Sequence, residues 1–113
     1  MGISFQSIGR QSVSFFGSAK LKAGQPCKVA SNNTVGACAA GDRFCGVVGN
    51  GRDGVYEVTL KGFVTLPYTG TAPTVGYSAL AADGNGGVAV TEDANEYLVT
   101  VVNTVDSTVG FFL

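Results

Sequence analysis

The stretch Gly41-Asp42-Arg43-Phe44-Cys45-Gly46-Val47-Val48 sets the pattern on which the fold prediction rests. It opens with a turn, continues as a short apolar run, and leads into a second turn at Gly49-Asn50-Gly51. Because successive side chains of a strand point to opposite faces, the run has two predicted faces. One face carries Phe44, Gly46 and Val48, and the other carries Cys45 and Val47. A short strand between two turns is typical of an all-β protein.

Residues 49–54 match the GxGxxG pattern of dinucleotide-binding loops. In those loops the glycines open a helix, whereas here they precede Val55–Leu60, in which Tyr56, Val58 and Leu60 alternate with polar residues. A period of two is that of a strand. The glycines are therefore predicted to form a hairpin turn, and the nucleotide-binding interpretation is rejected.

Further short strands are predicted along the chain, separated by turns about every 8–12 residues. They cover residues 13–15, 25–30, 34–38, 63–66 with a stop at Pro67, 76–81, 88–91, 97–102 and 108–113. Lys61-Gly62 is expected to bend the chain, and residues 83–87 to form a hairpin turn. The prediction is an all-β fold, a small barrel or sandwich of short antiparallel strands with little or no helix, whose last strand is paired inside the sheet.

Residues 1–20 are predicted to be an N-terminal arm or a first strand, followed by a single domain over residues 21–113. Phe15 and Phe16 are adjacent, so in a strand only one of them can enter the core. We hypothesise that this arm reaches a neighbouring subunit, with Phe5, Phe15 and Phe16 as apolar anchors and Arg10 as a polar contact. An ordinary first strand with one surface phenylalanine and a frayed terminus are the alternatives.

The composition narrows the possible partners. Charged residues make up 13% of the 113 residues, against about 25% in typical globular proteins. Either part of the surface is buried against other chains, or it is coated with Ser, Thr and Asn. The net charge of −1 and the lack of a basic run argue against nucleic acid as a partner. The lack of a long apolar run or targeting pattern argues against a membrane partner and predicts a protein made in the cytoplasm.

The chain contains no histidine and three cysteines, Cys27, Cys38 and Cys45, whose spacing matches no zinc pattern. They are predicted to be reduced, buried thiols. A disulfide between Cys27 and Cys38 and a Cys45 thiolate activated by Arg43 are the alternatives.

Most acidic residues fall in predicted turns, where a carboxylate accepts backbone hydrogen bonds. Asp83 and Asn85 match the start of a calcium loop, but the other ligands at EF-hand spacing are missing. We therefore predict no catalytic residue, no cofactor and no metal site, and a protein that is not an enzyme.

Several weak motifs in a particular order carry a family resemblance. They are residues 23–29 (AGQPCKV), 34–37 (TVGA), 41–48 (GDRFCGVV), 58–64 (VTLKGFV), 75–84 (VGYSALAADG) and 108–113 (TVGFFL). In this order, from Leu21 to Leu113, the chain resembles the small head decoration, or capsid cement, proteins of tailed bacteriophages. The resemblance implies a β-barrel-like virion protein that binds the outside of the assembled head. It would bridge major capsid protein subunits and form a homotrimer or another homo-oligomer.

One rival function remains from the sequence, a β-sandwich that binds carbohydrate on a virion or cell surface. Sugar sites use exposed aromatic platforms, and Tyr68 and Tyr77 flank one predicted loop. The absence of tryptophan argues against this function.

Overall fold

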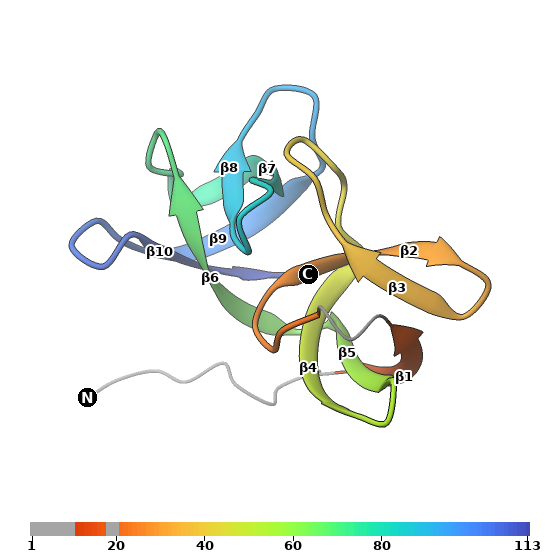
Figure 1. Cartoon of the computed structure of the whole chain (residues 1–113). Coiled ribbons are helices and arrows are strands. Elements are labelled where there is room, and N and C mark those ends of the chain that lie inside the picture. Colours follow the sequence, from red (N-terminus) through yellow and green to blue (C-terminus); the bar gives the residue numbers. More distant parts are fainter. Residues whose placement is uncertain (1–10, 18–20) are drawn as a thin grey trace, which may run out of the picture.

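The structure is a computed structural model that describes residues 11–17 and 21–113 (Figure 1). The described residues form ten strands and no helix, which confirms the all-β prediction. Among them, therefore, no helix could cross a membrane. The strands are β1 (Gln11–Gly17), β2 (Pro26–Ser31), β3 (Thr34–Ala37), β4 (Gly46–Arg52), β5 (Val55–Lys61), β6 (Phe63–Thr69), β7 (Gly76–Ala82), β8 (Val88–Val90), β9 (Glu96–Asn103) and β10 (Thr108–Phe112).

The strands close into two small barrels that follow one another in the chain (Figure 1). The first barrel has the order β1-β3-β2-β4-β5, and the second has β6-β8-β7-β9-β10. Most pairings are antiparallel, but each barrel contains one short parallel pairing, β1 with β3 and β6 with β8. The last strand, β10, pairs with both β6 and β9, as predicted for a strand inside the sheet.

The two barrels are the same fold repeated. If β1 to β5 are matched with β6 to β10 in order, every strand pairing in the first barrel has its counterpart in the second. The register agrees residue by residue: Pro26 pairs with Val47, and Tyr77 pairs with Leu98, each 51 positions later. This repeat was not predicted, because matched positions hold side chains as different as proline and tyrosine.

Each barrel has its own hydrophobic core. The first contains Leu21, Cys27, Val35, Val48 and Val58. The second contains Phe44, Leu66, Tyr68, Leu80, Val88, Val99, Val109 and Phe111. Gly62 has a φ of 115° and joins β5 to β6, so the bend predicted at Lys61-Gly62 is the junction between the barrels.

The predicted stop at Pro67 is wrong, because β6 continues to Thr69. Tyr68 N donates a hydrogen bond to Ser107 O at 3.0 Å, toward β10. The nitrogen of Pro67 therefore faces the opposite side of the strand. Pairing with β8 on that side begins only at Tyr68, so the missing N–H interrupts no ladder bond.

The glycine-rich segment 49–54 lies in a hairpin, as predicted, but its first four residues belong to β4. The register shifts between Val48 and Gly51, which marks a β-bulge. The turn itself is Asp53-Gly54, with φ values of 55° and 80°. Two successive positive φ values match the twist of a two-residue hairpin, and asparagine, aspartate and glycine tolerate them best.

Candidate functional site

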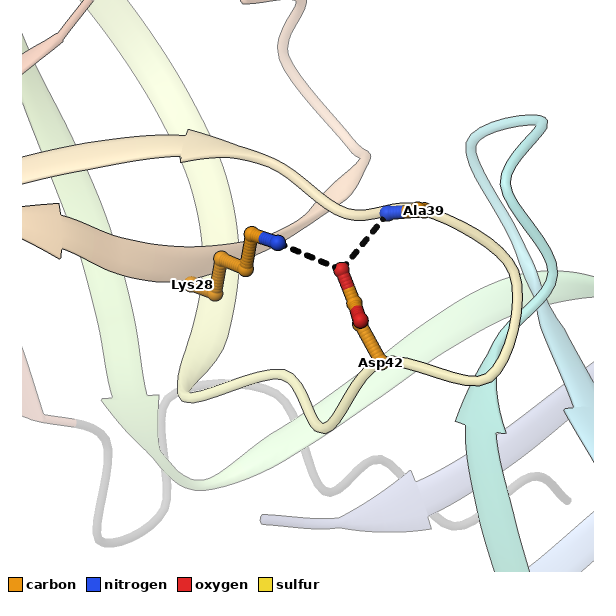
Figure 2. Close-up of polar contacts among 3 residues, drawn as sticks. All are labelled: Lys28, Ala39 and Asp42. Atoms are coloured by element: carbon orange, nitrogen blue, oxygen red, sulfur yellow. Dashed lines mark hydrogen bonds and ion pairs between the residues drawn. The ribbon is translucent and has the colours of Figure 1, made fainter.

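The segment at residues 38–45, here called the crossing loop, ties the two barrels together. Gly41 N donates to Ala82 O at 2.8 Å, and Ala82 N donates to Asp42 O at 2.9 Å, which connects the loop to β7. On the other side, Lys28 Nζ on β2 lies 2.6 Å from Asp42 Oδ2 (Figure 2). The loop is therefore bonded to both barrels at once.

Asp42 is the polar anchor of the crossing loop. Its Oδ2 also accepts a hydrogen bond from Ala39 N at 2.9 Å (Figure 2). The hydrogen bond from Lys28 and that from the Ala39 backbone lower the pKa of Asp42, and the same contact raises the pKa of Lys28. Because both side chains are partly exposed to solvent, the pair orients the loop more than it stabilises the fold.

Phe44 on the crossing loop enters the core of the second barrel. It stacks on Tyr97 with ring centroids 5.2 Å apart, and its ring meets that of Phe111 edge-on at 6.1 Å. Val48, predicted on the same face, lies in the first core, so the single shared face is wrong. The reason is that Phe44 precedes β4 and lies on a loop passing between two cores.

The three cysteines surround the start of the crossing loop as free thiols. Cys27 pairs with Gly46 on β4 and with Ala37 on β3, so Cys38 and Cys45 both follow or precede its partners. Cys45 N donates to Cys27 O at 2.8 Å, and Cys27 Sγ lies 3.7 Å from Gly46 O. Cys45 packs against the first core with Cys27, whereas Cys38 packs against the second.

This arrangement separates the acidities of the thiols. A hydrogen bond from Cys27, helped by backbone N–H groups, lowers the pKa of Cys45 to about 7. The same contact and burial raise the pKa of Cys27, and burial raises that of Cys38 to about 11. Arg43, which the sequence suggested as the activating group, is not among the causes of the Cys45 shift. The nearest chemistry to a reactive centre is therefore a thiol with a thiol neighbour.

Asp83 has a structural role in the turn between β7 and β8. Its Oδ1 accepts hydrogen bonds from Asn85 N at 2.7 Å and Gly87 N at 3.0 Å, which confirms the predicted hairpin turn. Within residues 11–17 and 21–113, no three His, Cys, Asp or Glu side chains gather as metal ligands.

Two open pockets lie where the barrels meet. One, of about 420 Å³, is lined by the segment 22–26, Pro67, Ala82 and the turn at 84–86. The other, of about 430 Å³, lies between β4, β5 and the start of β6, and Glu57 is its acidic residue. Neither lining brings together a pair of titratable groups suited to acid–base catalysis.

The structure describes two of the four predicted interface residues. Phe15 packs against the first core, and Phe16 is 60% exposed, so the two side chains diverge as adjacent strand residues must. Phe16 pairs with Val55, which is 38% exposed. Phe5 and Arg10 lie outside the described residues. The role of these residues as an interface stays a prediction.

No protein-family model matches the chain, and no curated protein matches it significantly. Function must therefore be argued from the surface of the molecule.

The largest exposed apolar feature is a row of aligned side chains across four strands of the second barrel, here called the second-barrel row. Tyr77 pairs with Leu98, Leu98 with Phe112, and Phe112 with Phe63. Tyr77 is 72% exposed and Leu98 is 40% exposed, while the rings of Phe112 and Phe63 meet edge-on at 5.3 Å. The sequence analysis missed this row, because it depends on the register of strands that are distant in the chain.

Proposed function

We propose that this chain is a structural protein that binds the outer surface of an assembled phage head and stabilises the capsid. Its partners are the major capsid protein and further copies of itself, and its location is the virion. The head resemblance rests on residues 21–113. The observation that carries the proposal is that large apolar side chains stay exposed on two separate faces, around Phe16 on the first barrel and Tyr77 on the second.

Two exposed apolar faces suit a protein that connects other proteins. Contiguous apolar surface is unfavourable in water unless a partner covers it. A chain with one such face can attach to a partner, and a chain with two can bridge neighbours. A ligand that binds only the assembled shell stabilises it by mass action, and many bridging copies add to the effect.

The carbohydrate-binding alternative loses one of its two tyrosines. Tyr68 is buried in the second core, so of this pair only Tyr77 is exposed as an aromatic platform. A flat row of neighbouring apolar side chains fits a protein surface better than a sugar, which needs hydrogen-bonding groups beside the ring.

The test is co-sedimentation with expanded heads from a phage that encodes this chain. The protein should pellet with the heads at a saturating ratio and raise the temperature at which they release DNA. The double variant Phe16→Asp with Tyr77→Asp should bind about tenfold or more weakly, since each charge would be buried on docking. Val105→Asp, at a 91% exposed turn position away from both faces, should bind like the wild type.

A wild-type protein that stays in the supernatant with expanded heads would overturn the proposal. Binding in a glycan screen that is lost in Tyr77→Asp would favour the carbohydrate alternative instead.

A further inference from the structure

The repeat lets the two barrels be compared position by position. In the first barrel, the residues matching the second-barrel row are Pro26, Val47, Thr59 and Ser12, here called the first-barrel row. They are aligned by the same pairings, Pro26 with Val47, Val47 with Thr59, and Thr59 with Ser12. The two rows are thus one surface that occurs twice in the chain.

The first-barrel row is covered by the second barrel. Val47 packs against the second core. Pro26 is buried and lines a pocket with Pro67 and Ala82. Thr59 is 4% exposed and faces Phe63 and Thr65 of β6 across the other pocket. The covering surface is therefore the outward side of β6 and the adjoining end of β7.

The second-barrel row is uncovered, although its side chains are larger and more apolar. Tyr77 stands where the first barrel has the buried Pro26, and it is 72% exposed. Leu98 stands where the first barrel has Val47. A protein acting alone would place its larger apolar side chains on the covered row, so the exposed row has the composition of a contact surface.

The counterpart of the covering surface is also exposed. Thr65 and Pro67 on β6 correspond by register to Ser14 and Phe16 on β1, because β6 pairs with β10 as β1 pairs with β5. Ser14 is exposed, and Phe16 is 60% exposed beside Val55. These three residues are here called the β1 face. One chain thus offers both halves of a contact that it already makes once internally.

We propose that the β1 face of one copy docks on the second-barrel row of another, as β6 covers the first-barrel row within a single chain. The contact is head-to-tail, with different surfaces on the two partners. Such contacts extend until the rotation between copies closes a ring or continues as an open chain. The low charge of the surface, 13% of residues with a net charge of −1, leaves little repulsion against this association.

This contact concerns self-association and does not depend on binding to phage heads. A protein that is monomeric at all concentrations but pellets with heads would overturn the contact and leave the proposed function intact. A self-associating protein that ignores heads would do the reverse.

The experiment is light scattering after size-exclusion chromatography, with purified full-length chain over a wide concentration range. The wild type should form species larger than a monomer. Tyr77→Asp on the second-barrel row and Phe16→Asp on the β1 face should each be monomeric, because either change buries a charge in the contact. Val105→Asp is the matched control and should assemble like the wild type.

Mixing the two monomeric variants is the decisive step. Tyr77→Asp keeps an intact β1 face and Phe16→Asp keeps an intact second-barrel row, so the mixture should form a dimer that cannot grow further. If the contact instead joined two identical surfaces, one of the single variants would still assemble and the mixture would gain nothing. Either of those results, or a monomeric wild type, would overturn the inference. Unchanged far-ultraviolet circular dichroism and melting temperature show that the exposed substitutions leave the fold intact.

Discussion

The first and second barrels share one strand order but differ in what fills them and in how tightly they close. The first core is small and aliphatic, whereas the second contains the rings of Phe44, Tyr68 and Phe111. In the first barrel, β2 and β4 share two paired residues, Pro26 with Val47 and Cys27 with Gly46. The matching strands of the second, β7 and β9, share four. The same topology is thus built once with short contacts and once with long ones.

The difference shows how the first barrel depends on the second. The crossing loop leaves the first barrel, delivers Phe44 to the second core and returns as β4. The first-barrel row is buried by the second barrel, which completes what its own short ladders leave open. We therefore expect the second barrel to be the more stable unit.

The largest expected effect comes from breaking this dependence with Phe44→Ala. Removing a buried ring that stacks on Tyr97 should cost about 3–5 kcal/mol of unfolding free energy. Val58→Ala in the first core should cost about 2 kcal/mol, since it removes two methyl groups. Chemical denaturation measures both, and Phe16→Ala, at an exposed site, is the matched control with a change within about 0.5 kcal/mol.

Amide hydrogen exchange locates the effect of Phe44→Ala. Protection should fall in β9 and β10, around the vacated ring site, and in the crossing loop. A loss confined to β2 and β3 would contradict the assignment of Phe44 to the second core.

A smaller effect is expected at a position that the repeat fills differently in each barrel. Gly46 and Tyr97 are matched by register, because they pair with Cys27 and Ser78. An added Cβ at Gly46 would lie 2.4 Å from Thr59 O, a backbone atom that cannot rotate away. Gly46→Ala should therefore cost about 1–3 kcal/mol, measured by chemical denaturation.

The control for Gly46→Ala is Gly36→Ala, where the nearest atom to an added Cβ is Ala30 Cβ at 3.4 Å. There the unfolding free energy should be unchanged or rise by up to about 1 kcal/mol, since alanine restricts the unfolded chain. Equal losses at both glycines would mean that strand flexibility, and not the close approach of β5, decides the outcome.

The smallest effect concerns chemistry and leaves the fold unchanged. The lowered pKa of Cys45, about 7, means that half of this thiol is thiolate near neutral pH and that the fraction falls at lower pH. In a Cys38→Ser background, alkylation of Cys45 by iodoacetamide should therefore reach half its maximal rate near pH 7. Mass spectrometry of the modified peptide measures it.

The cause of the Cys45 shift is tested by its neighbours. The titratable groups around it are Cys27 on β2, Cys38 in the crossing loop and Tyr97 on β9, whose pKa is raised mainly by burial. Cys27→Ala should move the alkylation midpoint up toward that of an ordinary thiol, about 8.5. Arg43→Gln should leave it unchanged. The opposite pattern would restore Arg43 as the activating group.

By itself, the sequence determined the local structure. The alternation in Val55–Leu60 and the turn signals at Asp53-Gly54 and Asp83–Gly87 depend on residues that are neighbours in the chain, so the strands and hairpins could be predicted. The divergence of Phe15 and Phe16 follows from the same geometry.

Only the tertiary structure decided that there are two barrels, that Phe44 belongs to the second and that Tyr77, Leu98, Phe112 and Phe63 form one row. These facts depend on the register between strands that lie far apart in the chain. Register is set by which faces are buried together, and very different side chains can satisfy the same burial. A repeat conserved in pairing but not in residue type is therefore hidden from any reading of the sequence alone.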